Sequence, residues 1–122
     1  MFNTDGFKTL KGLTDALMQR QEILSNNLAN IETKNYVRQD LDFGQVLSGL
    51  KNNAIQSDEG NGSILSTSRY RDYSGKMTLE SEMSKLYDNH LRYTLMVKSI
   101  SHHFEHMKKA LEVRASWHSL IY

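Results

Sequence analysis

The chain has 122 residues and a mass of 14.1 kDa, which is the size of a single domain. Its 15 basic and 14 acidic residues give a net charge of +1, so neither a nucleic-acid-binding surface nor strong attraction to anionic membranes is expected. It contains no cysteine, which excludes disulfides, thiolate metal sites and a cysteine nucleophile, and it contains no proline to interrupt a helix.

Residues 4–31 have the periodicity of an amphipathic helix. Apolar residues recur every seven positions along one side of this segment, which is typical of a helix that packs against another helix. The repeated positions are Leu10, Leu17, Leu24 and Ile31. Thr4 or Asp5 is suited to cap the start of the helix. We therefore predict a long N-terminal helix with one apolar seam.

The middle of the chain, residues 37–77, differs in composition. Glycine, serine and asparagine make up 14 of the 34 residues from 44 to 77, and these residue types favour turns. We predict an extended loop with a turn at 58–63 and short strands at Ile64–Leu65 and Tyr70–Tyr73. Because a loop of this length is uncommon in a compact domain, we expect it to order when it packs against other proteins.

Residues 78–122 predict a second and longer helix, which runs to about Ser116, followed by a tail. Thr78 is the expected cap, and apolar residues follow at alternating spacings of four and three to about residue 111. The seam of this helix is predicted at Met83, Leu86, Val97, Ile100, Phe104 and Met107. His90 falls on the same row, where we expect a hydrogen-bonded seam residue.

Together these segments predict a mainly α fold. The long N- and C-terminal helices would pack as an antiparallel coiled-coil-like pair, with an extended loop and short strands between them. Segments 1–36, 37–77 and 78–122 would form one structural domain.

The polar residues of the chain give little sign of catalysis. His102 and His106 lie one helical turn apart and could share a zinc ion, but the sequence places no third ligand beside them. We therefore favour a polar helix face there over a metal enzyme. Gly60–Ser63 lacks the lysine and the strand-to-helix context of a phosphate-binding loop. We expect no enzymatic activity, no catalytic residue, no cofactor, no metal and no small-molecule substrate.

An unusual density of asparagines marks the end of the first helix. Asparagine is a mediocre helix former, so three of them in one helix suggest a purpose other than helix stability. The segment resembles the N-terminal signature of the bacterial flagellar rod and hook proteins, in which an Asn-Asn-apolar-Ala-Asn core precedes a threonine and a tyrosine. The residues of this signature are Asn26, Asn27, Leu28, Ala29, Asn30, Thr33 and Tyr36.

Within this family the chain is similar to the short proteins of the proximal rod. It has no room for the large inserted domains of hook proteins, and Arg38–Phe43 is similar to an element that follows the signature. Further similar positions are Asp42, Phe43, Asn89 and Tyr93. The family usually has Pro-Gly before the tyrosine, where this chain has Lys34-Asn35, and Asn35 can still adopt the left-handed backbone conformation that glycine serves.

The resemblance implies a structural subunit of the flagellar basal-body rod. Such a subunit polymerises helically into the drive shaft and export channel across the periplasm. Its partners would be copies of itself, other rod and rod-base proteins, and the flagellar type III export gate. It would be exported without a cleaved signal peptide, and the first residues indeed lack the basic and apolar regions of one.

Two expectations follow for the residues of the chain. The signature asparagines and Tyr36 would bond adjacent subunits, and the seams would pair the two helices. The alternative is a soluble helical adaptor or chaperone that binds a partner helix, in which case the seams are recognition grooves and the monomer is well folded.

Overall fold

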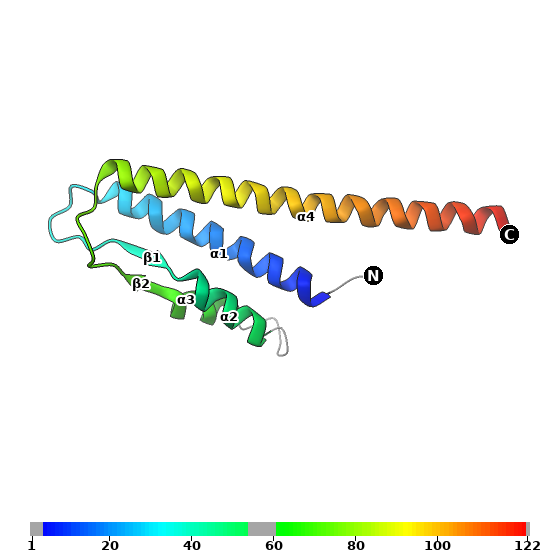
Figure 1. Ribbon diagram of the computed structural model, residues 1–122, viewed down its shortest axis with the longest axis horizontal. Coiled ribbons are helices and arrows are strands. Elements are labelled where there is room, and N and C mark those ends of the chain that lie inside the picture. The colour runs from blue at the N-terminus through cyan, green and yellow to red at the C-terminus, as the bar shows by residue number, and fades with distance from the viewer. Residues whose placement is uncertain (1–3, 54–60, 122) are drawn as a thin grey trace.

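The computed structural model describes residues 4–53 and 61–121, and it is dominated by two long helices that lie side by side (Figure 1). Shorter elements fold back along the free side of the first helix. The elements in chain order are α1 (Thr4–Ala29), β1 (Gln39–Leu41), α2 (Phe43–Asn53), α3 (Asn61–Ser68), β2 (Arg69–Arg71) and α4 (Leu79–Ile121). The structure confirms the predicted fold class, with α1 ending two residues earlier and α4 continuing five residues further than expected.

Contacts at both ends of α1 show that α1 and α4 run antiparallel. Near the start of α1, the ring of Phe7 meets that of Phe104 edge-to-face, with 5.4 Å between ring centroids. Near its end, the Asn27 side chain reaches the Glu82 carboxylate. Leu17 and Leu24 are buried in this pair, and Leu10 and Ile31 are half-buried at its margins. The apolar heptads of α1 therefore face its neighbours as predicted.

The seam of α4 differs from the predicted one. Leu86, Ile100 and Met107 are half-buried, but the side chains of Met83 and Val97 are 54% and 38% exposed. His90 is also exposed, and Phe104 keeps its contact with Phe7 although much of its ring faces solvent. The prediction was wrong for Met83, His90 and Val97.

The reason is that the interior positions of α4 are polar. Its two fully buried side chains are Glu82 and Asn89, each one residue before a member of the predicted row. Apolar periodicity cannot identify these two positions, because their residues are polar. A buried polar group is nevertheless tolerated when hydrogen bonds satisfy it.

A small apolar core joins α1 to the middle of the chain. It consists of Ala16, Val46 and Leu50, with Leu13, Phe43, Ile64 and Leu65 packed around them. Two glycines permit close contact between these helices, because a Cβ at Gly12 would collide with Leu50 and a Cβ at Gly49 would lie 2.8 Å from Ile64. Much of the middle segment is therefore helical, and the strand predicted at Ile64–Leu65 was wrong.

Two short strands complete the middle segment. β1 pairs with β2 antiparallel, with Asp40 opposite Tyr70, so the strand predicted at Tyr70–Tyr73 is present but begins one residue earlier and ends two residues earlier. Asn35 has a φ of 63°, which confirms that asparagine supplies the left-handed conformation there. Residues 58–60 of the turn predicted at 58–63 lie outside the described residues, and residues 61–63 begin α3, so the turn prediction was wrong for them. In the part of the chain that is described, no helix is long and apolar enough to cross a membrane.

Candidate functional site

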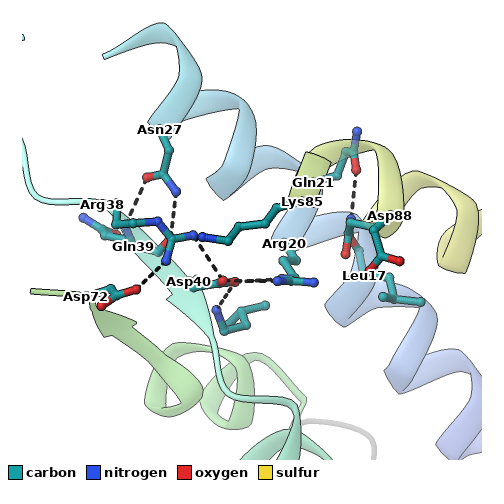
Figure 2. Close-up of polar contacts among 12 residues, drawn as sticks. Leu17, Arg20, Gln21, Asn27, Arg38, Gln39, Asp40, Asp72, Lys85 and Asp88 are labelled. Atoms are coloured by element: carbon teal, nitrogen blue, oxygen red, sulfur yellow. Dashed lines mark hydrogen bonds and ion pairs between the residues drawn. The ribbon is translucent and has the colours of Figure 1, made fainter. Parts of the chain in front are cut away.

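The signature asparagine Asn27 binds the first strand as a neighbouring strand would. Its side chain is fully buried at the end of α1. The amide Nδ2 donates to the Gln39 carbonyl at 2.8 Å, and the Gln39 amide donates to Oδ1 at 3.0 Å (Figure 2). The Tyr36 hydroxyl donates to the same Oδ1 at 3.2 Å. One side chain thus attaches β1 to α1 and fixes the loop between them.

Arg38 is the centre of a buried charge network beside this asparagine. All three of its guanidinium nitrogens meet carboxylates from different parts of the chain, and its side chain is only 6% exposed. Nε lies 2.7 Å from Glu82 Oε1 on α4. Nη1 lies 2.6 Å from Asp72 Oδ2 after β2, and Nη2 lies 3.3 Å from Asp40 Oδ2 on β1 (Figure 2). The geometry suits the planar fork of arginine, which a lysine cannot reproduce.

A second arginine completes the network from α1. Arg20 Nε lies 2.7 Å from Asp40 Oδ1, and its Nη2 donates to the other carboxylate oxygen at 3.2 Å. Lys85 approaches Glu82 at 3.8 Å. Three cations therefore balance three carboxylates, and Asn27 Nδ2 also lies 3.4 Å from Glu82 Oε2. We call these seven residues the junction, and they are Arg20, Asn27, Arg38, Asp40, Asp72, Glu82 and Lys85.

The charges of the junction stabilise one another against the cost of burial. Burial alone would raise the pKa of Asp40, but hydrogen bonds from Arg20 and the Leu41 amide and the charges of both arginines lower it. Hydrogen bonds from the Ser74 hydroxyl and amide, and from Arg38, lower the pKa of Asp72 to about 2. Burial opposes the charge of Arg38, yet its hydrogen bonds to Glu82 and Asp72 raise its pKa. Both carboxylates and the guanidinium therefore stay ionised near neutral pH.

The family-like positions after the signature fix the neighbouring helix. Asp42 caps α2, since its Oδ1 accepts the Gln45 amide at 3.2 Å, and its own amide donates to the Ser68 carbonyl at 2.9 Å. Phe43 lies beneath the Arg20 guanidinium, 5.6 Å from its carbon to the ring centroid. These two residues therefore position α2 and α3 relative to the junction.

Asn89 makes a second amide contact between the long helices. It is fully buried, and its Nδ2 donates to the Leu17 carbonyl at 2.9 Å and to Gln21 Oε1 at 2.8 Å. Its own Oδ1 is buried without a hydrogen-bond partner among the described residues. Tyr93, one turn further along α4, is half-buried. Asn89 fixes the register of α4 on α1, because its amide reaches one particular backbone carbonyl.

The remaining signature residues lie at the surface. Asn30 Nδ2 donates back to the Asn26 carbonyl at 2.9 Å, and the Thr33 hydroxyl donates to Asn30 Oδ1 at 3.1 Å. Asn26, Ala29 and Thr33 are exposed, and Leu28 and Asn30 are half-buried. Their role between subunits stays a prediction. Asn27 and Tyr36, by contrast, are used within the chain, because their polar atoms bond to each other and to β1.

Sequence reasoning did not select the charged members of the junction. The sequence indicates Arg38 and Asp40 only as part of the family-like element Arg38–Phe43. The available signal was the spacing of Glu82 and Asn89, because two polar residues seven positions apart share the face that a partner helix covers.

The histidine pair stands apart from this site. The rings of His102 and His106 meet edge-to-face with 4.4 Å between centroids. Within residues 4–53 and 61–121, no group of three or more His, Asp or Glu side chains is arranged to hold a metal ion.

Comparisons with known proteins point to one family. A profile of the family described as flagella basal body rod protein matches residues 14–36, which run from the middle of α1 through the loop to Tyr36. The flagellar basal body rod protein FlgB of Bacillus subtilis (strain 168) is 26% identical over 119 residues, and the match covers 84% of this chain and 92% of that protein. Both findings support a structural role in the flagellar basal body. They confirm that the chain resembles the flagellar basal body rod proteins and is FlgB-like.

Proposed function

We propose that this chain is a non-enzymatic subunit of the flagellar proximal rod, which polymerises helically into the drive shaft and export channel across the periplasm. The match at residues 14–36 carries this proposal, because it contains Asn27, around which the fold is assembled. Its partners are copies of itself, other rod and rod-base proteins, and the type III export gate, which it passes without a cleaved signal peptide.

The arrangement of the elements suits transmission of torque. A drive shaft needs subunits that resist twisting, and long helices locked at a fixed register supply stiffness. The junction and Asn89 lock α4 on α1 at two places, which lie one heptad apart on α4. Residues 1–122 then act as one structural domain, with the outward faces of both long helices left for neighbouring subunits.

Deletion of the gene tests the proposal directly. We expect loss of motility, with purified basal bodies that keep the membrane ring and the export gate but lack rod and hook under the electron microscope. The wild-type gene supplied in trans should restore both. Intact, motile flagella in the deletion strain would contradict the proposal and favour the soluble adaptor.

A surface variant tests the contact between subunits. Asn26 is exposed, so Asn26→Asp should keep the circular dichroism spectrum of the protein yet abolish rod assembly. Ser48→Asp adds the same charge to an exposed position on α2 and is the matched control, which should remain motile. Normal motility of the Asn26→Asp strain would remove Asn26 from the interface.

A further inference from the structure

The last part of α4 extends beyond α1 and has an apolar surface. Figure 1 shows this part of α4 running past the start of α1. Met107 is the last half-buried residue of the helix, and every position from 108 to 121 is exposed. These 14 residues span about 21 Å at 1.5 Å per residue. Trp117 is 63% exposed, Leu120 78% and Ile121 68%. Apolar side chains that protrude in this way mark a contact with another molecule.

A groove lies further back along the same helix. Its volume is about 310 Å³, and α1, the start of α2 and α4 form its walls. The lining residues are Leu13, Leu17, Phe43, Arg92, Leu95, Met96 and Ser99. Leu95 is 65% exposed, so the groove is open to solvent. The end of α4 cannot fold back into this groove, because the helix between them is continuous. The groove is therefore accessible to a second molecule.

The groove and the protruding end share one face of α4, and the spacing along this face is symmetrical. The steps between its residues are three, four, three and four up to His106, and then four, three, four and three beyond it. Such steps keep residues on one side of a helix. Between Leu95 and Leu120 this face carries no Asp, Glu, Lys or Arg. We call it the central α4 face, and its members are Arg92, Leu95, Ser99, His102, His106, Ala110, Val113, Trp117 and Leu120.

We propose that two copies of the chain pair antiparallel through the central α4 face, about a two-fold axis at His106. Because the spacing is the same in both directions, every residue of the face meets a counterpart on the other copy. Trp117 of each copy then lies over Leu95 of the other, Val113 over Ser99, and Ala110 over His102. The protruding end of each helix enters the groove of the other copy, so one contact covers both unpartnered apolar surfaces.

Charge and side-chain size support this register. In an antiparallel helix pair, flanking residues on the same side of the two helices lie next to each other. Glu105 of one copy then lies near both Glu105 and Lys109 of the other, and the two-fold axis places two lysines beside the two glutamates to offset their repulsion. The small Ser99 and Ala110 lie opposite the larger Val113 and His102, which allows close approach of the helices.

The dimer goes beyond the proposed function. A two-fold contact closes on itself, whereas a helical polymer needs a contact that stays open. The dimer is therefore a form of the unassembled protein, in which the apolar end of α4 is covered. If the dimer is absent, the proposed role in the rod is unaffected, and the deletion experiment tests that role separately.

Single cysteines test the symmetry of the pair, because the chain has none of its own. His106→Cys should form a disulfide-linked dimer by itself, since the two positions meet at the axis. Trp117→Cys alone should stay monomeric on a denaturing gel, but it should cross-link when mixed with Leu95→Cys. Ser101→Cys, exposed on another side of α4, is the control and should not cross-link. A mixed cross-link without the His106→Cys dimer would mean an open head-to-tail contact and would overturn the two-fold pair, as would the absence of all cross-links.

The oligomeric state of the full chain gives a second test. By light scattering at about 100 µM, the wild-type chain should be a dimer, and Trp117→Glu should raise the dissociation constant at least about tenfold. Ser116→Glu adds the same charge one position away, off the central α4 face, and should remain dimeric. Trp117→Glu should keep the helical circular dichroism signal, because its side chain is mostly exposed in the single chain. A monomeric wild-type chain, or an unchanged constant for Trp117→Glu, would overturn the proposal.

Discussion

The two ends of α4 differ in what holds them. At its start, α4 is fixed to α1 and β1 by buried charges and amides, with Glu82 and Asn89 completely enclosed. At its end, α4 carries five large apolar side chains, and all of them are exposed: Leu111, Val113, Trp117, Leu120 and Ile121. The start of α4 is therefore the end that is fixed within a single chain. Hydrogen-bonding geometry sets the register of α4 on α1, whereas the apolar side chains at the end of α4 lie at the surface.

The largest expected loss of stability comes from removing Arg38, the central residue of the junction. Arg38→Ala leaves Glu82, Asp40 and Asp72 without their shared cation, and loss of one partner of a buried ion pair costs about 3–5 kcal/mol. Urea unfolding monitored by circular dichroism should show this loss of unfolding free energy. Arg71→Ala, an exposed arginine on β2, is the control and should change the unfolding free energy by less than about 0.5 kcal/mol. Similar values for the two variants would show that the junction contributes little to stability.

The next largest effect tests the Asn27 side-chain amide separately from the charged residues of the junction. Asn27→Ala removes the side chain that pairs with both backbone groups of Gln39, and buried groups left unsatisfied cost about 1–3 kcal/mol. Its exposed neighbour supplies the comparison, since Asn26→Ala should be nearly neutral. Urea unfolding midpoints of both variants measure the difference. Equal midpoints would mean that the Asn27 amide positions β1 without stabilising the fold.

Some features of the fold can be predicted from the sequence, and others cannot. Helix pairing and the Thr78 cap follow from periodicity and local propensity, the left-handed conformation of Asn35 follows from the family resemblance, and the structure agrees with all three. The charge network could not be predicted, because it joins Arg38 to residues 34 and 44 positions away, and only the finished fold brings them together.

The middle segment shows a second limit of sequence patterns. Gly49 permits close packing of α2 against Ile64 on α3, whereas the glycines of the middle segment predict a loop from composition alone. Tertiary packing overrides local propensity where glycine lets two helices come close together. The sequence therefore does not predict α2 and α3.

Acid should weaken the junction selectively. The pKa values of Asp40 and Asp72 are lowered by folding, so their contribution to stability is present above the ordinary value of 3.8 and is lost as the pH falls towards about 2. We expect the urea midpoint to fall over this range in the wild-type chain. Asp72→Asn cannot be protonated at this position and should show a shallower fall. If the urea midpoints of the wild-type chain and of Asp72→Asn fell equally with pH, Asp72 would not contribute to acid sensitivity.

The smallest effect is expected at the end of α4. The same substitution, leucine to alanine, can be made there and at a buried position of α1. Leu111 is 64% exposed and lies outside the central α4 face, so Leu111→Ala should change the unfolding free energy by less than about 0.5 kcal/mol. Leu24 is fully buried against α1's neighbours, and Leu24→Ala should cost about 2–5 kcal/mol. Urea unfolding of both variants at one low protein concentration makes the comparison. A large loss for Leu111→Ala would mean that the end of α4 is already covered within the folded chain, and the difference between the two ends of this helix would disappear.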